Sequence, residues 1–375
     1  MDAEHNSFVI HFGRLTDPRL KRKRRHPLIN IITITVLAVI AGAEGWTDVE
    51  RFGKAKRAWL STFLELPNGI PSHDTFGRFF GLLNPVEFQQ SFINWTREIH
   101  EKAEGSVAFD GKTARRSHDA NKNKRAIHIV SAWATDSGIA LGQVKVDDKS
   151  NEITAIPELL KLVDVKDCLV TSDAMGCQRE IAQAVVEAGG DYLLAVKGNQ
   201  ETLHEDIQQE FKEAQAQNFA HMDCEYHETI DKGHGRIEQR QYWYTSDIQG
   251  LGTLEQWPGL SAMVRCRSTR TVKGQTSVED RYFITSNKSR PGQTVAAAIR
   301  AHWGIENKLH WVLDIAFSED QCRIRTGYAA ENFATIRKLA LTALNTNKSR
   351  TGGVKAKRLQ AAWDTDYLKE MFMRI

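Results

Sequence analysis

The sequence lacks the cysteine patterns that build zinc sites or disulfide frameworks. Its five cysteines are an odd number, no two of them form a CxxC pair, and the zinc-binding HExxH motif is also absent. These absences argue against a zinc site and against disulfide cross-links. They favour a protein that works in a reducing compartment.

A hydrophobic run long enough to cross a bilayer is missing as well. The longest apolar stretch covers residues 28–43 and is interrupted by Asn30, Thr33 and Thr35. A membrane helix needs about 20 apolar residues. Residues 1–25 are polar and basic, without the cleavage site of a secretory signal. We therefore expect a cytoplasmic protein with no membrane partner.

The chain has little excess charge of either sign. Its formal net charge is +3, so composition alone does not indicate a nucleic-acid-binding protein. The cations are unevenly placed, with blocks at residues 21–25 and 115–125 and a basic tail from residue 329 onwards. Such blocks are either solvated surface or contacts to phosphate groups.

What the chain does have is length and a change of pattern. Its 375 residues are enough for two domains, or for one domain with a large insertion. Apolar residues at helical spacing predict helices within residues 28–64 and over residues 85–100. We predict an N-terminal helical domain over residues 1–100, a candidate for DNA binding, and a second domain over residues 101–375.

The second domain has the pattern of an α/β fold. Short apolar runs predict strands over residues 106–109, 128–134, 139–146, 167–171 and 191–196, with helices over residues 152–163 and 178–188. This order suits a mixed sheet flanked by helices. At about residues 203–290 a polar helix is followed by β-like sequence punctuated with glycines. We predict that this segment is a β-rich insertion.

Three carboxylates stand out by their context. Asp110 and Asp173 each follow a predicted strand, at the strand ends where α/β sheets place their chemistry. Glu306 lies within a predicted helix between Trp303 and Trp311. A carboxylate at an apolar helix position is costly unless it is paired, protonated or bound to a cation.

This carboxylate set suits two-metal chemistry. Two strand-end aspartates and a helical glutamate can bind two divalent ions about 3.5–4 Å apart, which activate the attacking oxygen and stabilise the leaving oxygen in phosphoryl transfer. Carboxylate oxygens favour Mg²⁺ (or Mn²⁺) over zinc. The alternative is that each aspartate is a turn residue or a helix cap.

Motifs along nearly the whole chain carry a family resemblance. They are Asp17-Pro18-Arg19, His26-Pro27-Leu28, Gly69-Ile70-Pro71-Ser72-His73-Asp74-Thr75-Phe76, Phe109-Asp110-Gly111-Lys112-Thr113, Lys149-Ser150-Asn151-Glu152-Ile153, Thr171-Ser172-Asp173-Ala174-Met175, Val196-Lys197-Gly198-Asn199-Gln200, His234-Gly235-Arg236-Ile237-Glu238 and His302-Trp303-Gly304-Ile305-Glu306-Asn307. In this order they resemble the H-repeat-associated insertion-sequence transposases, relatives of the DDE transposases. The resemblance implies an RNase-H-like core in which Asp110, Asp173 and Glu306 are the catalytic, metal-binding triad.

The same resemblance implies a function and its partners. The expected activity is metal-dependent strand cleavage at the ends of a mobile element, followed by strand transfer into target DNA. A homodimer is expected on DNA because two ends must be joined. A metal-dependent nuclease without strand transfer, and an inactive DNA-binding remnant of a mobile element, are the alternatives.

One departure from the related transposases concerns phosphate binding. Their signature places an Arg and a Lys around the glutamate, whereas this chain has His302 and Leu313 at the corresponding positions. His302 can replace the Arg in part, but Leu313 cannot replace a Lys.

Five residues near the triad are candidates for substrate binding: Lys112, Lys197, Asn199, Arg236 and His302. For Lys112 the alternative is a solvated side chain, and for Arg236 it is a simple turn. A zinc site on the shared helix face of His302, Glu306 and His310 is disfavoured, and His310 is expected to be structural.

Two further pairs of residues are not expected to take part in metal or DNA binding. Glu319 and Asp320 are expected in a surface loop, although they could be mistaken for the third ligand. Trp303 and Trp311 are expected in the core rather than as a platform for base stacking.

Overall fold

The computed structural model describes residues 6–99, 105–118, 125–146, 150–233, 235–288 and 292–373. The chain forms two compact units. The first contains Met1–Lys102, Gly111–Ser150 and Glu306–Ile375, and the second contains Ala103–Asp110 and Asn151–Ile305. The predicted boundary between two domains near residue 100 differs from this division, because the first unit also contains segments that follow residue 100. The predicted domain boundary stays a prediction.

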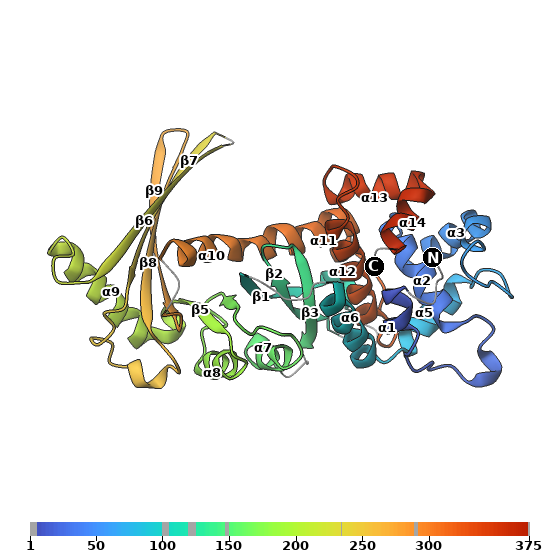
Figure 1. The fold of residues 1–375 in the computed structure, drawn as a ribbon, viewed down its shortest axis with the longest axis horizontal. Helices are drawn as coiled ribbons and strands as arrows, with labels where there is room; N and C mark the ends of the chain where they lie inside the picture. The colour runs from blue at the N-terminus through green and yellow to red at the C-terminus, as the bar shows by residue number, and fades with distance from the viewer. Residues whose placement is uncertain are drawn as a thin grey trace. The chain divides into compact units, whose positions relative to one another are not determined.

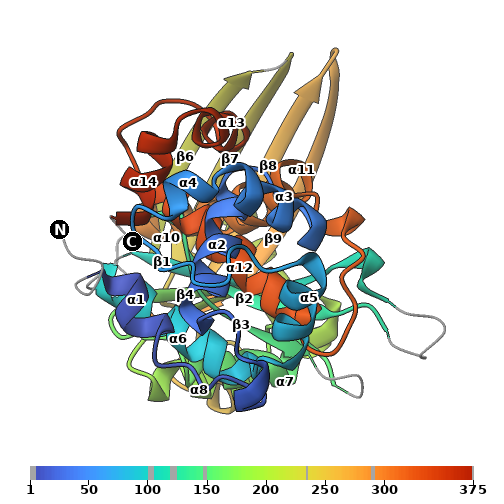
Figure 2. The same ribbon diagram turned by 90° about the vertical axis from the view of Figure 1, so that its right-hand side faces the viewer.

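The first unit is built around two buried helices. α2 (Leu28–Ile40) and α12 (Ala329–Thr346) pack against each other, and both are buried along almost their whole length. Around them lie α1 (Ser7–Phe12), α3 (Trp46–Ala55), α4 (Arg57–Leu60), α5 (His73–Leu82) and α6 (Pro85–Ile99) (Figure 2). The predicted helical character of the N-terminal region is confirmed.

The basic C-terminal tail is folded into this unit. α13 (Val354–Trp363) and α14 (Thr365–Met373) follow α12. Lys357 donates to the backbone carbonyls of Leu344 and Asn347, and Arg358 donates to that of Val39. Arg337 and Lys338 are also buried. The interpretation of this tail as a phosphate-contacting block is therefore wrong for these four cations, because they stabilise the interior.

The residues that the structure describes form a nine-stranded sheet in the order β3-β2-β1-β4-β5-β9-β8-β7-β6. β2 (His128–Ala134) and β3 (Ile139–Val146) form the predicted antiparallel hairpin of the first unit. β1 (Ser106–Thr113) pairs in parallel with β4 (Leu169–Ser172), and β4 pairs in parallel with β5 (Asp191–Val196). α7 (Glu152–Leu160) lies between β3 and β4 in the chain, and α8 (Arg179–Glu187) connects β4 to β5. The predicted α/β class, a mixed sheet flanked by helices, is confirmed.

The predicted β-rich insertion is a ribbon of four long antiparallel strands (Figure 1). These strands are β6 (Cys224–Gly233), β7 (Arg236–Thr245), β8 (Ala262–Val272) and β9 (Gln275–Thr285). α9 (Glu201–Ala216) packs Phe211 against Tyr282 on one face of the ribbon. On the other face, α10 (Gly292–Gly304) packs Val295 and Ile299 into a core with Phe283.

The helix that carries Glu306 is not a regular α-helix. α10 is followed directly by a π-helical turn over Ile305–His310 and then by α11 (Trp311–Phe317). The predicted helix around Glu306 is thus present, but it is interrupted at Glu306 by this turn. Among the helices that the structure describes, none combines the length and apolar content needed to cross a membrane.

Candidate metal and DNA-processing site

Asp110 and Asp173 follow paired residues on neighbouring parallel strands. Phe109 of β1 is the register partner of Ser172 of β4, and each aspartate is the residue that follows in the chain. Asp173 lies just beyond β4, as predicted, whereas Asp110 lies within β1, which is longer than expected. The parallel pairing therefore brings the two aspartates to the same level of the sheet.

The carboxylate of Asp173 also organises the turn that follows β4. Its Oδ1 accepts hydrogen bonds from the backbone N–H groups of Met175 at 2.9 Å and Gly176 at 3.3 Å. Asn199 donates from Nδ2 to the carbonyl of Ala174 at 2.7 Å, which ties the segment after β5 to this turn. Asp173 is thus a turn residue through one oxygen, and its other oxygen remains available as a ligand.

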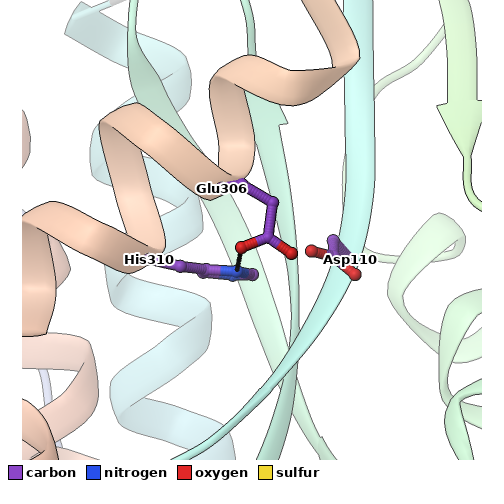
Figure 3. Close-up of side chains that lie close together, drawn as sticks. All are labelled: Asp110, Glu306 and His310. Atoms are coloured by element: carbon purple, nitrogen blue, oxygen red, sulfur yellow. Dashed lines mark ion pairs between the residues drawn. The ribbon is translucent and has the colours of Figure 1, made fainter. Parts of the chain in front are cut away.

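Asp110, Glu306 and His310 form a group suited to binding a cation (Figure 3). Each offers one ligand atom, and these atoms lie within 4.8 Å of one another. Two carboxylates and one imidazole are a donor set that divalent ions accept, so the residues fit the expected metal. Asp173 is outside this group.

Glu306 is more exposed than its sequence context indicated. Its side chain is 55% exposed, so the argument that an apolar setting makes this carboxylate costly is wrong. His310, four residues later, is buried. Burial lowers the pKa of His310 to about 3, and the nearby cations Lys338 and Lys112 add to that effect.

His302 is held beside the second aspartate. Its Nδ1 lies 2.9 Å from the hydroxyl oxygen of Thr171, at hydrogen-bond distance. Burial lowers the pKa of His302 despite the opposing effect of Asp173. The ring is therefore neutral at neutral pH, so it does not supply the positive charge of the Arg found in related sequences.

Lys112 is bound by three carboxylates of its own unit. Its ammonium lies 2.7 Å from Asp314, 3.4 Å from Glu319 and 3.2 Å from Asp320. Burial alone would lower the pKa of Lys112, but Glu319 and the other two carboxylates raise it overall. The solvated alternative for Lys112 is wrong, and its contact with DNA phosphate stays a prediction.

The acidic pair Glu319 and Asp320 is not the surface loop that was predicted. Glu319 is only 4% exposed and also lies 3.5 Å from Arg337, and Asp320 pairs with Arg115 at 3.3 Å. These carboxylates belong to a charge network around Lys112.

The remaining predicted contacts are exposed. Lys197 follows β5, and Arg236 begins β7, where it lies 3.5 Å from Glu238. His234 lies outside the described residues. Trp303 and Trp311 are 44% and 60% exposed, so their prediction as core residues is wrong. Arg281 stacks over the ring of Trp303 at 5.3 Å.

Comparison with known proteins decides the family. A family profile described as "Transposase DDE domain" matches residues 96–343, and one described as "DDE_Tnp_1-associated" matches residues 9–96. The chain belongs to the DDE transposase family.

Curated relatives resemble this DDE transposase chain from end to end. The H repeat-associated putative transposase YhhI of Escherichia coli (strain K12) is 40% identical over 97% of each chain. The putative transposase YncI of Escherichia coli O157:H7 is 42% identical over 97% of this chain and 94% of the relative. A solved piggyBac transposase synaptic complex with hairpin DNA aligns with a TM-score of 0.44 and 12% identity, covering 98% of this chain and 80% of that one.

The sequence places His310 on the helix face of Glu306, and in the structure both lie near Asp110. The sequence does not indicate the partners of Lys112, which lie about 200 positions away in the chain. No local pattern could have identified those partners, because they come together only through tertiary folding.

Proposed function

We propose that the chain is an active DNA transposase that cleaves DNA strands at element ends and transfers the freed 3′-hydroxyl into target DNA. Asp110, Asp173 and Glu306 are the catalytic carboxylates and hold Mg²⁺ (or Mn²⁺). The observation that carries this proposal is the register of β1 and β4, which places Asp110 and Asp173 after paired residues. The proximity of ligand atoms on Asp110 and Glu306 supports it.

The protein residues have separable roles in this reaction. When bound, divalent metal activates the attacking oxygen and stabilises the leaving oxygen. Asp110, fixed within a strand, sets the position of one ligand. Asp173 offers one oxygen while its other oxygen holds the following turn. The exposed carboxylate of Glu306 faces solvent, where a DNA strand can approach.

Exposed cations supply the contacts with DNA in this proposal. Lys197 extends from the end of β5, and Arg236 from the hairpin of the ribbon. Asn199 and His302 position the segments around Asp173. The N-terminal region, with its exposed basic block at residues 21–25, is a second DNA-binding element, and a homodimer joins two ends.

The experiment is a transposition reaction with supercoiled DNA that carries the element ends. The wild-type chain should give nicked and joined products in Mg²⁺ or Mn²⁺, and Glu306→Gln should abolish both while it still binds the ends. Glu158→Gln is the control, because Glu158 is an exposed residue of α7 whose carboxylate pairs with the exposed Lys161. It should react like wild type.

Each other outcome contradicts a specific part of the proposal. Cutting without joining identifies a metal-dependent nuclease. Binding without cutting identifies an inactive remnant. Near-normal activity of Glu306→Gln, with loss of activity in Glu319→Gln, shows that the third catalytic carboxylate was assigned to the wrong residue.

A further inference from the structure

The imidazole of His310 lies beside the Glu306 carboxylate on one helix (Figure 3). Both residues belong to the π-helical turn that interrupts the helix between α10 and α11. Turns of this kind occur mostly as single interruptions of α-helices, frequently at functional sites. Glu306 is exposed and His310 is buried, so the pair reaches from solvent into the protein interior.

The distance between the two side chains is informative. Nδ1 of His310 lies 3.7 Å from Oε2 of Glu306. This exceeds the length of a hydrogen bond from nitrogen to oxygen, which is about 3.2 Å or less. Two atoms bound to one ion at about 2.1 Å are roughly 3.0 Å apart at a right angle and roughly 4.2 Å apart on opposite sides. The observed separation lies between these limits.

We propose that His310 is a nitrogen ligand of the metal bound by Asp110 and Glu306, which makes the centre a mixed nitrogen and oxygen site that prefers Mn²⁺ to Mg²⁺. The proposal rests on the proposed function, because it assumes that these carboxylates hold a metal. It goes beyond the carboxylate triad by assigning a fourth ligand of different chemistry. The group of Asp110, Glu306 and His310 carries it, since all three ligand atoms lie within 4.8 Å of one another.

The metal preference follows from the ligand type. Mg²⁺ is a hard ion that binds oxygen at near-ideal octahedral geometry and retains its waters. Imidazole nitrogen is a ligand that suits transition-metal ions, whereas Mg²⁺ favours oxygen. Loss of His310 should therefore weaken binding of Mn²⁺ more than binding of Mg²⁺.

Pulsed electron paramagnetic resonance of the full chain with one equivalent of Mn²⁺ tests the assignment. A directly bound imidazole gives a ¹⁴N modulation of the Mn²⁺ echo, and labelling with ¹⁵N-histidine should replace it by the ¹⁵N pattern. His310→Gln should lose the modulation and bind Mn²⁺ at least about tenfold more weakly, since even loss of a ligand's supporting partner costs about 10–100-fold. His128→Asn is the matched control, because His128 is another imidazole close enough to act on His310. It should keep the signal.

The outcomes separate this proposal from the proposed function. Mn²⁺ that binds in wild type and is lost in Asp110→Asn, but shows no nitrogen modulation, overturns the role of His310 and leaves the carboxylate site intact. Wild-type chain that binds no Mn²⁺ and no Mg²⁺ overturns both. If His310→Gln does not fold, ¹⁵N-histidine labelling of the wild type, with His128→Asn retaining the modulation, still decides whether histidine binds the ion.

Discussion

Replacing Lys112 by methionine should destabilise the first unit strongly. The methionine retains the apolar stem but leaves Asp314, Glu319 and Asp320 without their shared cation. Glu319 is only 4% exposed and would retain Arg337 at 3.5 Å. Removing one partner of a buried ion pair costs about 3–5 kcal/mol. Because Asp314 and Asp320 are 31% and 20% exposed, solvent offsets part of that cost, and we expect about 3 kcal/mol.

Thermal unfolding followed by circular dichroism measures this loss. For a unit of about 200 residues, each kcal/mol shifts Tm by about 2–4 °C, so Lys112→Met should unfold roughly 6–12 °C below wild type. Lys161→Met is the matched control, because its pair with Glu158 is exposed on both sides, at 70% and 61%. Its shift should be within about 2 °C.

A double substitution separates the ion pairs from other effects of the methionine. Glu319→Gln removes the most buried of the three carboxylate charges. If the pairs carry the stability, the loss in the double variant should be smaller than the sum of the two single losses by about 0.5–3 kcal/mol. Strict additivity, or a Lys112→Met variant as stable as Lys161→Met, would refute the reasoning, because it would mean that water screens this network fully.

Three further predictions follow from single contacts. The carboxylate of Glu238 lies 3.5 Å from Arg236 and 3.7 Å from Arg270, and it also binds Arg240. Glu238→Gln removes this negative charge and should tighten DNA binding. The slope of log K against log salt concentration should steepen by about 0.9 for each additional phosphate contact. A flatter slope in filter-binding titrations would contradict this. Burial lowers the pKa of Lys338 from 10.5 to about 8. Between pH 8 and pH 10.5 the unfolded chain therefore binds more protons at this residue than the folded chain does. In urea titrations, the free energy of unfolding of the wild type should therefore rise relative to that of Lys338→Met as the pH rises from 8 to 10.5. Below pH 8 the difference between the two free energies should be constant. Asp173→Asn keeps an oxygen for the N–H groups of Met175 and Gly176, so calorimetry should show lost metal binding with wild-type stability, whereas Asp173→Ala should also lose about 1 kcal/mol of stability. Equal stability of the two variants would show that the turn does not need the oxygen.

The strands of the central sheet could be predicted because their burial leaves a mark in the sequence. β2, β3 and β5 have the predicted bounds, since apolar runs of about six residues end at turns rich in glycine or polar residues. β6 was not predicted as a separate strand. It is an edge strand with most side chains exposed or half-buried, so its sequence has no apolar run. β6 is held in place by its pairing with β7 over ten residues, and its own sequence does not indicate that pairing.

The candidate metal-binding carboxylates could be proposed from the sequence, whereas the contacts around them could not. Asp110 and Asp173 follow apolar strands, and that local context survives in the folded chain as the pairing of Phe109 with Ser172. The environment of the basic residues, in contrast, could not be predicted from local sequence. Arg358 looked like a surface residue of a basic helix, yet it donates to the carbonyl of Val39, more than 300 positions away. A charged residue is predicted at the surface because burying a charge without a hydrogen-bond partner is costly. For Arg358 the partner is distant in the sequence, so the local pattern does not reveal it. Local sequence therefore identifies candidate ligands at strand ends, but it does not distinguish a cation exposed to solvent from one that supports the fold.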